Sequence, residues 1–373
     1  MQLRLGVVPD YRAEKWPSMD LVADMLLQEI RAGRAGEVQA ESLCPAFKTR
    51  FTRLPFFGKS SSAFNADRLL NRMFDYPRHA AKAARDFDCF HICDHAYANI
   101  RHVLPAARTG VFCHDLDTFR CLFDPRQEPR SRAFKSMMRR VLTGLERAAL
   151  VFHTTHEIRR QILAHGIVDE KRLVQAPYGV APLFSPMESR QGGTPSDTER
   201  PYILHVGSCI ARKRIDVLLD VFAAIRKSFP ELRLIQVGGE WTAEQAAQIA
   251  RLDLGRDIEQ TGRMTQEQIA VLYRGAALVL QPSDAEGFGL PVAEALACGA
   301  TVVASSIPAL MEVGGSAAVY CPPGELAPWI STLERLLRVP DSAPPRSLRL
   351  AQASRFSWTT HARTICDAYR TLV

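Results

Sequence analysis

The sequence lacks any long apolar run. No stretch of its 373 residues approaches the roughly 20 consecutive apolar residues that a membrane-spanning helix needs. The opening segment, MQLRLGVVPDYR, also lacks the apolar stretch and the small-residue cleavage site of a secretory signal, and it predicts a short first strand. We therefore expect a cytoplasmic protein, either soluble or peripheral at the inner face of a membrane.

The cysteines lack a regular spacing. There are nine cysteines, an odd number without metal or disulfide spacing, so we expect reduced thiols. Cys89, His91, Cys93 and His95 do alternate along one segment, which superficially suggests zinc. On an extended strand, however, four alternate residues span about 20 Å, too far to surround one ion. The segment predicts a buried strand, with His95 near its carboxyl end as a site candidate.

Acidic residues are outnumbered. The 47 Lys and Arg against 40 Asp and Glu give a net charge of +7, which favours an anionic partner without choosing among nucleotide, lipid headgroup and nucleic acid. Basic residues concentrate at 68–85 and 130–147, each with apolar residues at near-helical spacing. A solvated basic face is the favoured interpretation of both, and peripheral contact with an anionic membrane stays open.

Short apolar runs alternate with amphipathic helical stretches along the whole chain. This alternation is typical of α/β proteins whose parallel sheets are covered on both faces. The predicted strands are Leu3–Val8, Val38–Leu43, Phe87–Cys93, Gly110–Cys113, Leu150–Thr154, Arg172–Ala176, Tyr202–Val206, Leu232–Val237, Ile258–Thr261, Leu278–Gln281, Thr301–Ala304 and Ala318–Cys321. The segment Pro182–Pro201 is rich in Pro, Ser, Gly and charge, and it predicts a linker between two domains.

The densest chemical signal is LVLQPSDAEGFGLPVAEALACGATVVAS, residues 278–305, where a strand leads through a loop into a helix. The loop carries Glu286, then Gly287 and Gly289, which permit close backbone approach, and the helix carries Glu294. Backbone N–H groups at the start of such a helix are well placed to bind a phosphate. A hydrolase with paired carboxylates is disfavoured, because eight helical steps separate the two Glu residues by about 12 Å rather than about 5–5.5 Å.

A second signal is YILHVGSCIARKRIDVLLDVF, residues 202–222. A buried strand is followed by a Gly turn, then by Arg212 and Lys213 at the strand-to-helix turn. A cation there would stabilise a departing nucleoside diphosphate. On its own this pattern equally describes a solvated turn.

Together the two segments resemble the retaining glycosyltransferases of the GT-B fold, in particular glycosyltransferase family 4 (glycosyl transferases group 1). The resemblance runs from HVGSCIARKR through LIQVGG and residues 261–305 to PALMEVGG, and it includes the E-x7-E motif. It implies two Rossmann-like, doubly wound parallel-sheet domains facing a cleft. We expect an acceptor domain at 1–182, a linker at 183–200 and a donor domain at 201–355, with a terminal helix at 356–373 packing on the first domain.

The resemblance also implies roles for residues. Glu286 would lie against the donor sugar, Glu294 would hold the ribose hydroxyls, and Arg212 and Lys213 would neutralise the diphosphate. Ser208 stands where many members carry Arg, and Tyr178 where Asn is usual. The expected donor-binding set is completed by Gly207, Ser208, Arg263, Met264, Gly287, Phe288, Gly289 and Leu290.

The first half matches the family more loosely. His114 follows a predicted strand, where members often carry a His near the reacting sugar, and it is a catalytic candidate. The acceptor-binding candidates are Tyr11, Arg12, His95 and Asp115, although the usual Gly-rich turn is absent from Pro9–Asp20. Asp115 and Asp117 form a D-x-D pattern, a weak metal signal. We expect neither a metal nor a cofactor.

The predicted function is retaining transfer of a sugar from a UDP- or GDP-linked donor to a hydroxyl of a polysaccharide, lipopolysaccharide or glycolipid. A sugar-nucleotide epimerase or a phosphorylase of the same fold would need other acid/base carboxylates or a pyridoxal-binding Lys, and neither motif is found. The charge also permits a nucleic-acid-binding protein, but the sequence has no recognisable recognition helix or aromatic-rich platform, so we expect no nucleic acid partner.

Overall fold

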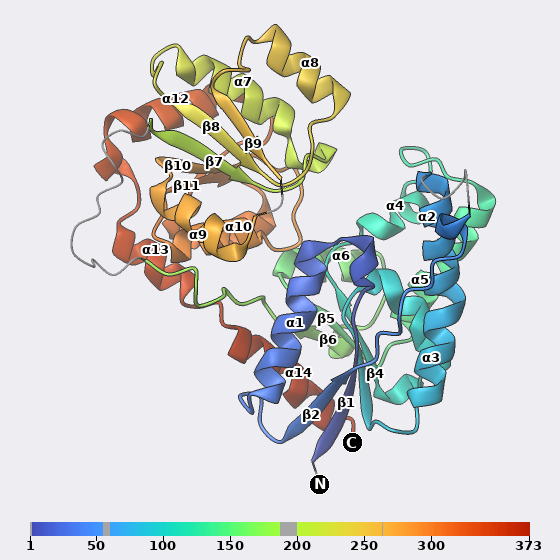
Figure 1. Ribbon diagram of the computed structural model, residues 1–373. Helices are drawn as coiled ribbons and strands as arrows, with labels where there is room; N and C mark the ends of the chain where they lie inside the picture. Colours follow the sequence, from blue (N-terminus) through green and yellow to red (C-terminus); the bar gives the residue numbers. More distant parts are fainter. Residues whose placement is uncertain (1, 55–59, 187–199, 263) are drawn as a thin grey trace. The chain divides into compact units, whose positions relative to one another are not determined.

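The computed structural model describes residues 2–54, 60–186, 200–262 and 264–373, which form two compact units (Figure 1). The first unit comprises Met1–Gly179 and Trp358–Val373, and the second comprises Val180–Ser357. These bounds lie within a few residues of the expected 1–182 and 356–373. Residues 187–199, most of the expected linker at 183–200, lie outside the described part of the chain.

The first unit is built on a six-stranded parallel sheet in the order β2-β1-β3-β4-β5-β6. The chain starts at β1, adds β2 on one side and then continues on the other side from β3, so β1 and β3 flank a switch point. The strands are β1 Leu3–Val8, β2 Val38–Ser42, β3 Cys89–Ile92, β4 Thr109–Cys113, β5 Leu150–His153 and β6 Leu173–Gln175.

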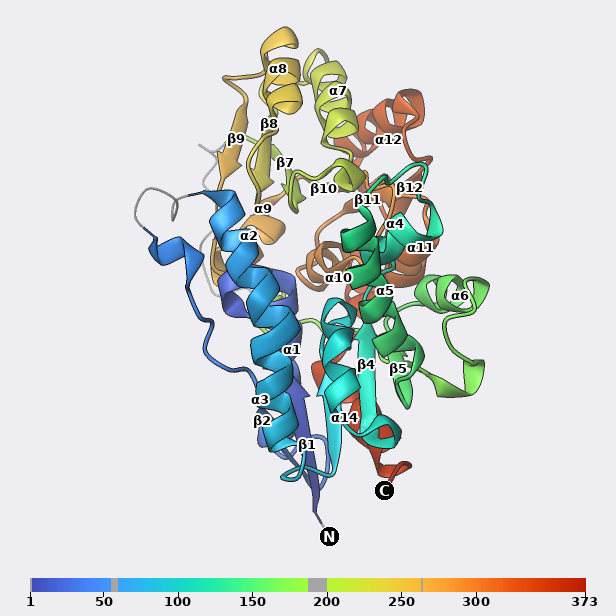
Figure 2. The same ribbon diagram turned by 90° about the vertical axis from the view of Figure 1, so that its right-hand side faces the viewer.

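Helices cover both faces of this sheet. Figures 1 and 2 show α1 and α14 on one face and α3 and α5 on the other. The helices are α1 Pro17–Arg31, α2 Ser61–Leu70, α3 Tyr76–Ala83, α4 Arg120–Phe123, α5 Arg132–Glu146, α6 His156–Ala164 and α14 Trp358–Arg370. Short 3-10 turns connect them at η1 Arg12–Glu14, η2 Phe51–Arg53, η4 His95–Val103, η5 Ala106–Arg108, η6 Asp117–Phe119 and η7 Glu170–Arg172.

The two basic stretches are helical. Residues 130–147 contain α5, which buries Val141, Leu142 and Leu145. Residues 68–85 span the end of α2, a π-turn at η3 Asn71–Asp75 and the whole of α3, which Figure 2 shows as one long rod.

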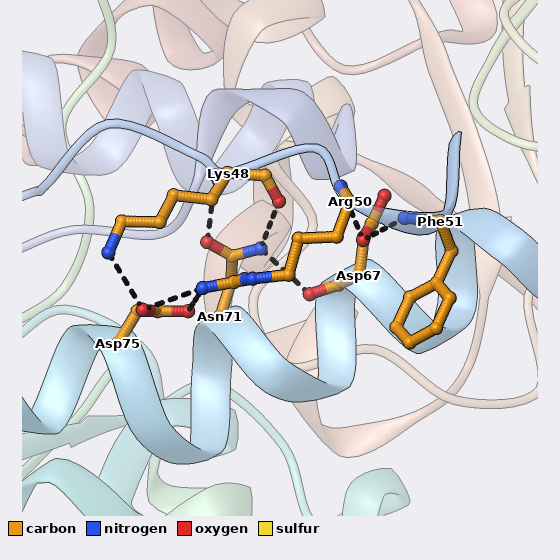
Figure 3. Close-up of polar contacts among 6 residues, drawn as sticks. All are labelled: Lys48, Arg50, Phe51, Asp67, Asn71 and Asp75. Carbon is orange, nitrogen blue, oxygen red and sulfur yellow. Dashed lines mark hydrogen bonds and ion pairs between the residues drawn. The ribbon is translucent and has the colours of Figure 1, made fainter. Parts of the chain in front are cut away.

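The rod holds the segment after β2 through one helix face (Figure 3). Asp67 accepts hydrogen bonds from the backbone N–H groups of Arg50, Phe51 and Thr52 at 2.8, 2.9 and 3.0 Å. Burial alone would raise the pKa of Asp67, but these donors and the Thr52 hydroxyl outweigh it and lower the pKa to about 2. Farther along the same face, Asn71 exchanges two hydrogen bonds with the backbone of Lys48, and Asp75 pairs with Lys48 and Arg50.

The terminal helix α14 belongs to the first unit. Its Tyr369 hydroxyl donates to the carbonyl of Phe90 in β3 at 2.8 Å, and its Thr359 hydroxyl donates to Glu29 of α1 at 2.6 Å. These contacts carry the chain from the end of the second unit back onto the first sheet.

The second unit is built on a six-stranded parallel sheet in the order β12-β11-β10-β7-β8-β9, which is a doubly wound arrangement. Its strands are β7 Tyr202–Val206, β8 Arg233–Val237, β9 Ile258–Thr261, β10 Leu278–Gln281, β11 Val302–Ser305 and β12 Val319–Cys321. The strand order reverses between β7 and β10, so these two adjacent strands flank its switch point. Ligands of open parallel sheets bind at such points, outside the carboxyl ends of the strands.

Helices also cover both faces of the second sheet (Figure 1), with α7 and α12 packed together on one side and α9, α10, α11 and α13 on the other. They are α7 Ile215–Arg226, α8 Ala243–Arg251, α9 Gln266–Gly275, α10 Leu290–Ala297, α11 Pro308–Gly314, α12 Leu326–Arg338 and α13 Arg346–Ala353, with 3-10 turns η8 Ala211–Lys213, η9 Gly315–Ala317 and η10 Pro340–Ser342.

The predicted fold class is confirmed: both sheets are parallel and doubly wound, and every predicted strand is present. The differences are at strand ends. The expected Phe87–Cys93, for example, is shortened to Cys89–Ile92, although the N–H of Cys93 still donates to the carbonyl of Val8 at 3.0 Å. Among the described helices, none combines the length and apolarity needed to span a bilayer.

Candidate functional site

Three charged residues meet at the switch point of the second unit. The turn η8 follows β7 and carries Arg212 and Lys213, while the loop after β10 carries Glu286. The Lys213 Nζ lies 2.6 Å from Glu286 Oε1, and Arg212 Nη1 lies 3.2 Å from Glu286 Oε2. The sheet therefore joins two sequence segments that lie more than seventy residues apart.

Glu286 is held by more than its two cations. Its Oε1 also accepts hydrogen bonds from the Ser283 hydroxyl at 2.7 Å and from Gln281 Nε2 at 2.9 Å. Burial by itself would raise the pKa of Glu286, but Lys213 and Arg212, followed by the hydrogen bond from Ser283, lower it to about 2. The carboxylate is thus ionised at neutral pH, and the three charges sum to one net positive charge.

Glu294 has a different environment, although it lies in the same motif. Its side chain is buried in α10, and its Oε2 accepts a hydrogen bond from the Tyr273 hydroxyl of α9 at 3.2 Å. Burial raises the pKa of Glu294 to about 8, and the Tyr273 hydrogen bond opposes this shift only in part. Glu294 is therefore mostly protonated at neutral pH.

The start of α10 requires glycine. Gly289, the residue before the helix, has a φ of 98°, and a Cβ there would lie 2.5 Å from Leu310 Cδ2. Beside it, the Phe288 ring is buried and packs edge-on against Phe356 at 5.3 Å. Because the ring is buried, the backbone is the part of Phe288 that remains for contact with a donor. Gly287 and Leu290 adjoin these two residues in the same turn.

The other expected donor residues are more dispersed. Gly207 lies beside the cluster, since a Cβ on it would be 3.7 Å from Lys213 Cε, and Ser208 follows it. Met264 lies beyond β9, which β8 separates from β7, and its sulfur accepts a hydrogen bond from Thr261 at 3.3 Å. Arg263 lies outside the described residues.

His114 in the first unit is buried, and both nitrogens of its ring are hydrogen-bonded. Its Nε2 lies 2.6 Å from the carbonyl of Cys93, and its Nδ1 is hydrogen-bonded to the Tyr178 hydroxyl. Because the carbonyl can only accept, Nε2 carries the proton and Nδ1 accepts from Tyr178. Both ring nitrogens are thus engaged, and burial lowers the pKa of His114. Tyr178, which stands where Asn is usual in the family, thus occupies the second ring nitrogen of His114.

The four acceptor candidates fall in two places. His95 and Asp115 follow β3 and β4, where His95 Nε2 lies 3.1 Å from Thr118 Oγ1 and 3.7 Å from Asp115 Oδ1. Tyr11 and Arg12 instead line a pocket of about 400 Å³ after β1. Within the described residues, no group of three or more His, Cys, Asp or Glu is arranged to hold a metal ion.

Several residues of the site were not predicted. Gln281 and Ser283 contact Glu286, Tyr273 contacts Glu294, and Arg214 pairs with Asp284 at 3.0 Å. Ser283 and Gln281 lie within the recognised motif, and their closeness in sequence to Glu286 was an available signal. The contacts of Tyr273 with Glu294 and of Arg214 with Asp284 had no such signal, because each joins two elements that are distant in the sequence.

The second unit matches a known protein family. Residues 188–351 match the family described as glycosyl transferases group 1. The O-antigen chain mannosyltransferase B of Escherichia coli is 27% identical over 86% of this chain and 83% of its own length. The serotype-specific mannosyltransferase WbdA of the same organism is 25% identical over 71% of this chain, which spans about a third (34%) of that relative.

Solved structures share the whole architecture. Sucrose-phosphate synthase from Thermosynechococcus elongatus aligns with a TM-score of 0.73 at 19% identity, covering 99% of each chain. HepE of Anabaena, in complex with UDP and glucose, aligns with a TM-score of 0.72 at 16% identity, covering 99% of this chain and all (100%) of the other. The chain therefore carries a glycosyl transferases group 1 domain at residues 188–351 and has the GT-B fold.

Proposed function

We propose that this chain transfers a sugar from a nucleoside-diphosphate sugar to a hydroxyl of a growing glycan, with retention of anomeric configuration and without a metal. The observation that carries the proposal is the cluster of Arg212, Lys213 and Glu286 at the switch point of the second sheet. Its two cations come from one loop and its carboxylate from the other, so a ligand entering the switch point would meet both.

A diphosphate fits this cluster electrostatically. A cation about 4 Å from a phosphate oxygen contributes on the order of 4 kcal/mol at an effective dielectric constant of 20, and two cations are present. The start of α10 adds backbone N–H groups and the positive end of a helix dipole. These groups supply the positive field for which many phosphate sites use a metal.

The reaction would place charge where this cluster acts. The bond between the anomeric carbon and the diphosphate oxygen breaks, the acceptor oxygen bonds to that carbon from the same face, and the acceptor proton passes to the leaving diphosphate. Lys213 and Arg212 would stabilise the negative charge gained by the diphosphate. Glu286, kept ionised, would stabilise the positive charge that develops on the sugar.

The nucleoside would bind beside the cluster. Glu294 and Tyr273 offer a buried carboxyl and a hydroxyl within one site, which suits the vicinal hydroxyls of a ribose. The bound UDP in HepE supports a uridine nucleotide, while the mannosyltransferase names of the Escherichia coli relatives support a mannosyl donor. Both UDP- and GDP-linked donors therefore need testing.

A glycan is the acceptor that the relatives favour. The O-antigen chain mannosyltransferase acts, by its name, on a polysaccharide, and its match covers most of both chains. On this chain the acceptor would use the first unit, where Tyr11 and Arg12 line the pocket after β1. We place the reaction in the cytoplasm, and the solvated basic face of α5 leaves peripheral contact with an anionic membrane open.

The test is a binding and turnover screen. The purified chain is mixed with UDP-glucose, GDP-mannose and related donors, with and without EDTA, and thermal stabilisation and nucleotide release are measured. A cognate donor at 100 times its dissociation constant should add about 2.7 kcal/mol to stability, with equal turnover in EDTA. Absence of stabilisation by every donor would refute the donor site, and loss of activity in EDTA that Mg²⁺ or Mn²⁺ restores would refute metal independence.

A further inference from the structure

Arg214 has an unusual backbone conformation. It lies between the turn η8 and helix α7 with φ 50° and ψ 50°, in the left-handed region. Glycine adopts this conformation without steric cost, whereas a long side chain is disfavoured there. Such an outlier beside a binding loop calls for an explanation in what the side chain does.

The Arg214 side chain joins the two loops of the switch point. Its Nη1 lies 3.0 and 3.1 Å from the two carboxylate oxygens of Asp284, which is in the loop after β10. Its Nε and Nη2 contact Asp216 in the first turn of α7 at 3.0 and 2.9 Å. One planar guanidinium therefore ties the loop after β7, the start of α7 and the loop after β10 together.

Two further bonds connect the same loops. The N–H of Asp284 donates to the carbonyl of Arg212 at 2.9 Å, and Arg212 Nη1 donates to the carbonyl of Ala285 at 3.0 Å. Lys213 lies in the chain between Arg212 and Arg214, and its Nζ bonds to Glu286 two residues beyond Asp284. The position of the Lys213 ammonium relative to Glu286 therefore depends on the contacts on both sides of it.

We propose that Arg214 and Asp284 form a positioning clamp that holds the Arg212–Lys213 loop at the spacing from Glu286 that a diphosphate requires. This inference rests on the proposed function, because it assigns the clamp to the diphosphate subsite of the same site. Neither residue needs to touch the donor. The clamp acts by keeping two cationic side chains in place before the ligand arrives, which reduces the ordering that binding must supply.

A purely structural ion pair makes opposite predictions. The pair is partly exposed, since the side chains of Arg214 and Asp284 keep 27% and 44% of their exposure, and such pairs contribute little to folding. Glycine at position 214 would also relieve the left-handed backbone. Arg214→Gly should therefore leave the melting temperature unchanged or raise it. If Arg214 served stability alone, the same substitution would lower the melting temperature.

The experiment compares a nucleoside diphosphate with its nucleoside. UDP or GDP, whichever the chain binds, is titrated calorimetrically against wild type, Arg214→Gly, Asp284→Asn and the double variant, and uridine or guanosine is measured by competition. We expect the dissociation constant for the diphosphate to rise about 10-fold in each single variant and no further in the double variant. The constant for the nucleoside should change less than twofold.

A matched control separates the loss of the Arg214 side chain from the effect of placing glycine in a left-handed backbone conformation. Asp253 has the same left-handed φ of 50° in the second unit but lies exposed at the end of α8. Asp253→Gly should therefore leave both dissociation constants unchanged. Asp284→Asn keeps the proposal testable if Arg214→Gly fails to fold, because it removes one charge without altering the backbone.

Three outcomes would overturn the clamp: unchanged diphosphate binding in both single variants, an equal loss for nucleoside and diphosphate, or losses that multiply in the double variant. Each of them, with wild-type binding intact, leaves the proposed function standing. If wild type binds neither UDP nor GDP, the proposed function fails and the clamp fails with it.

Discussion

Two glutamates of one motif have opposite ionisation at neutral pH. Glu286 contacts two cations and the Ser283 hydroxyl, which bring its pKa to about 2 in spite of burial. Among the described residues, the Tyr273 hydroxyl is what opposes a similar burial at Glu294, and the pKa of Glu294 rises to about 8. The spacing of the motif is visible in the sequence, but the partners that decide the charge come from other elements. Their different charge states lead to separate tests.

Donor affinity should depend on pH through Glu294. Ribose hydroxyls donate hydrogen bonds more strongly to a carboxylate than to a protonated carboxyl group, so donor binding favours the ionised form. As the pH falls below about 8, Glu294 becomes protonated in the empty site, and donor affinity should fall by up to about 10-fold per unit. Calorimetric titration between pH 6.5 and 9 measures this directly.

Glu294→Gln is the control for that dependence. An amide does not titrate, so the variant should bind the donor more weakly and with little change across the same pH range. A wild-type dissociation constant that stays flat through pH 8 would show that Glu294 does not contact the donor.

Lys213 should matter mainly in the transition state. One preorganised group that stabilises developing charge is typically worth about 10²-fold or more in rate, so Lys213→Ala should lower kcat by about that factor. Lys213→Arg keeps the charge and should recover part of the rate. Steady-state kinetics with the cognate donor decides the matter, and a loss below threefold for Lys213→Ala would remove Lys213 from the diphosphate site.

Some residue roles could not be predicted because they depend on a distant partner. The position of His114 after a strand was correctly recognised, but only the fold brings the Tyr178 hydroxyl onto its Nδ1. Phe288 was expected among the donor-binding residues, but the sequence did not indicate that its ring packs against Phe356, from the end of the second unit. In both cases the neighbour lies more than sixty residues away.

At the scale of elements, the strands were predictable and the irregular helices were not. Apolar β-branched runs fix β7 and β10 because buried parallel strands need them on both faces. The π-turn at η3 Asn71–Asp75 carries no comparable pattern. It places Arg72 over the Tyr97 ring at 4.0 Å and beside Glu14, contacts that tertiary packing supplies.

The contact between α5 and η4 requires a glycine. A Cβ on Gly144 would lie 2.0 Å from the carbonyl oxygen of Ala98, a backbone atom that cannot swing aside. We expect Gly144→Ala to destabilise the protein by about 1–3 kcal/mol, the usual cost of overpacking, or by more. Urea denaturation followed by circular dichroism measures the change.

Ser136→Ala serves as the matched control, since Ser136 is exposed on the same helix. It should leave the urea midpoint nearly unchanged. If Gly144→Ala leaves the urea midpoint as little changed as Ser136→Ala does, α5 and η4 do not pack as closely as described.

At the scale of the whole molecule, buried histidines make the fold sensitive to acid. Burial lowers the pKa of His91 and His205 to about 3, and of His153 and His361 to about 4. In the unfolded chain these groups have a pKa of about 6.5, so the unfolded state binds protons first as the pH falls. Their stabilising effect is complete above that value and is lost progressively as the pH falls toward 4.

The expected loss is measurable. At pH 5.5 each of these histidines should reduce the free energy of unfolding by about 1.4 kcal/mol relative to pH 7.5. The urea midpoint should therefore be lower at pH 5.5 than at pH 7.5, and the difference should be smaller in a variant such as His91→Gln than in wild type. An equal midpoint at both values would mean that these side chains are not buried in the neutral form.

The most direct test of the account is to follow a cognate α-linked nucleotide-sugar together with a glycan acceptor by proton NMR in EDTA, with wild type and with Lys213→Ala. We predict consumption of the donor, release of the nucleoside diphosphate and an α-linked product with wild type, at a rate about 10²-fold lower with the variant. A β-linked product, or equal rates in the two proteins, would contradict a retaining transfer that depends on Arg212, Lys213 and Glu286.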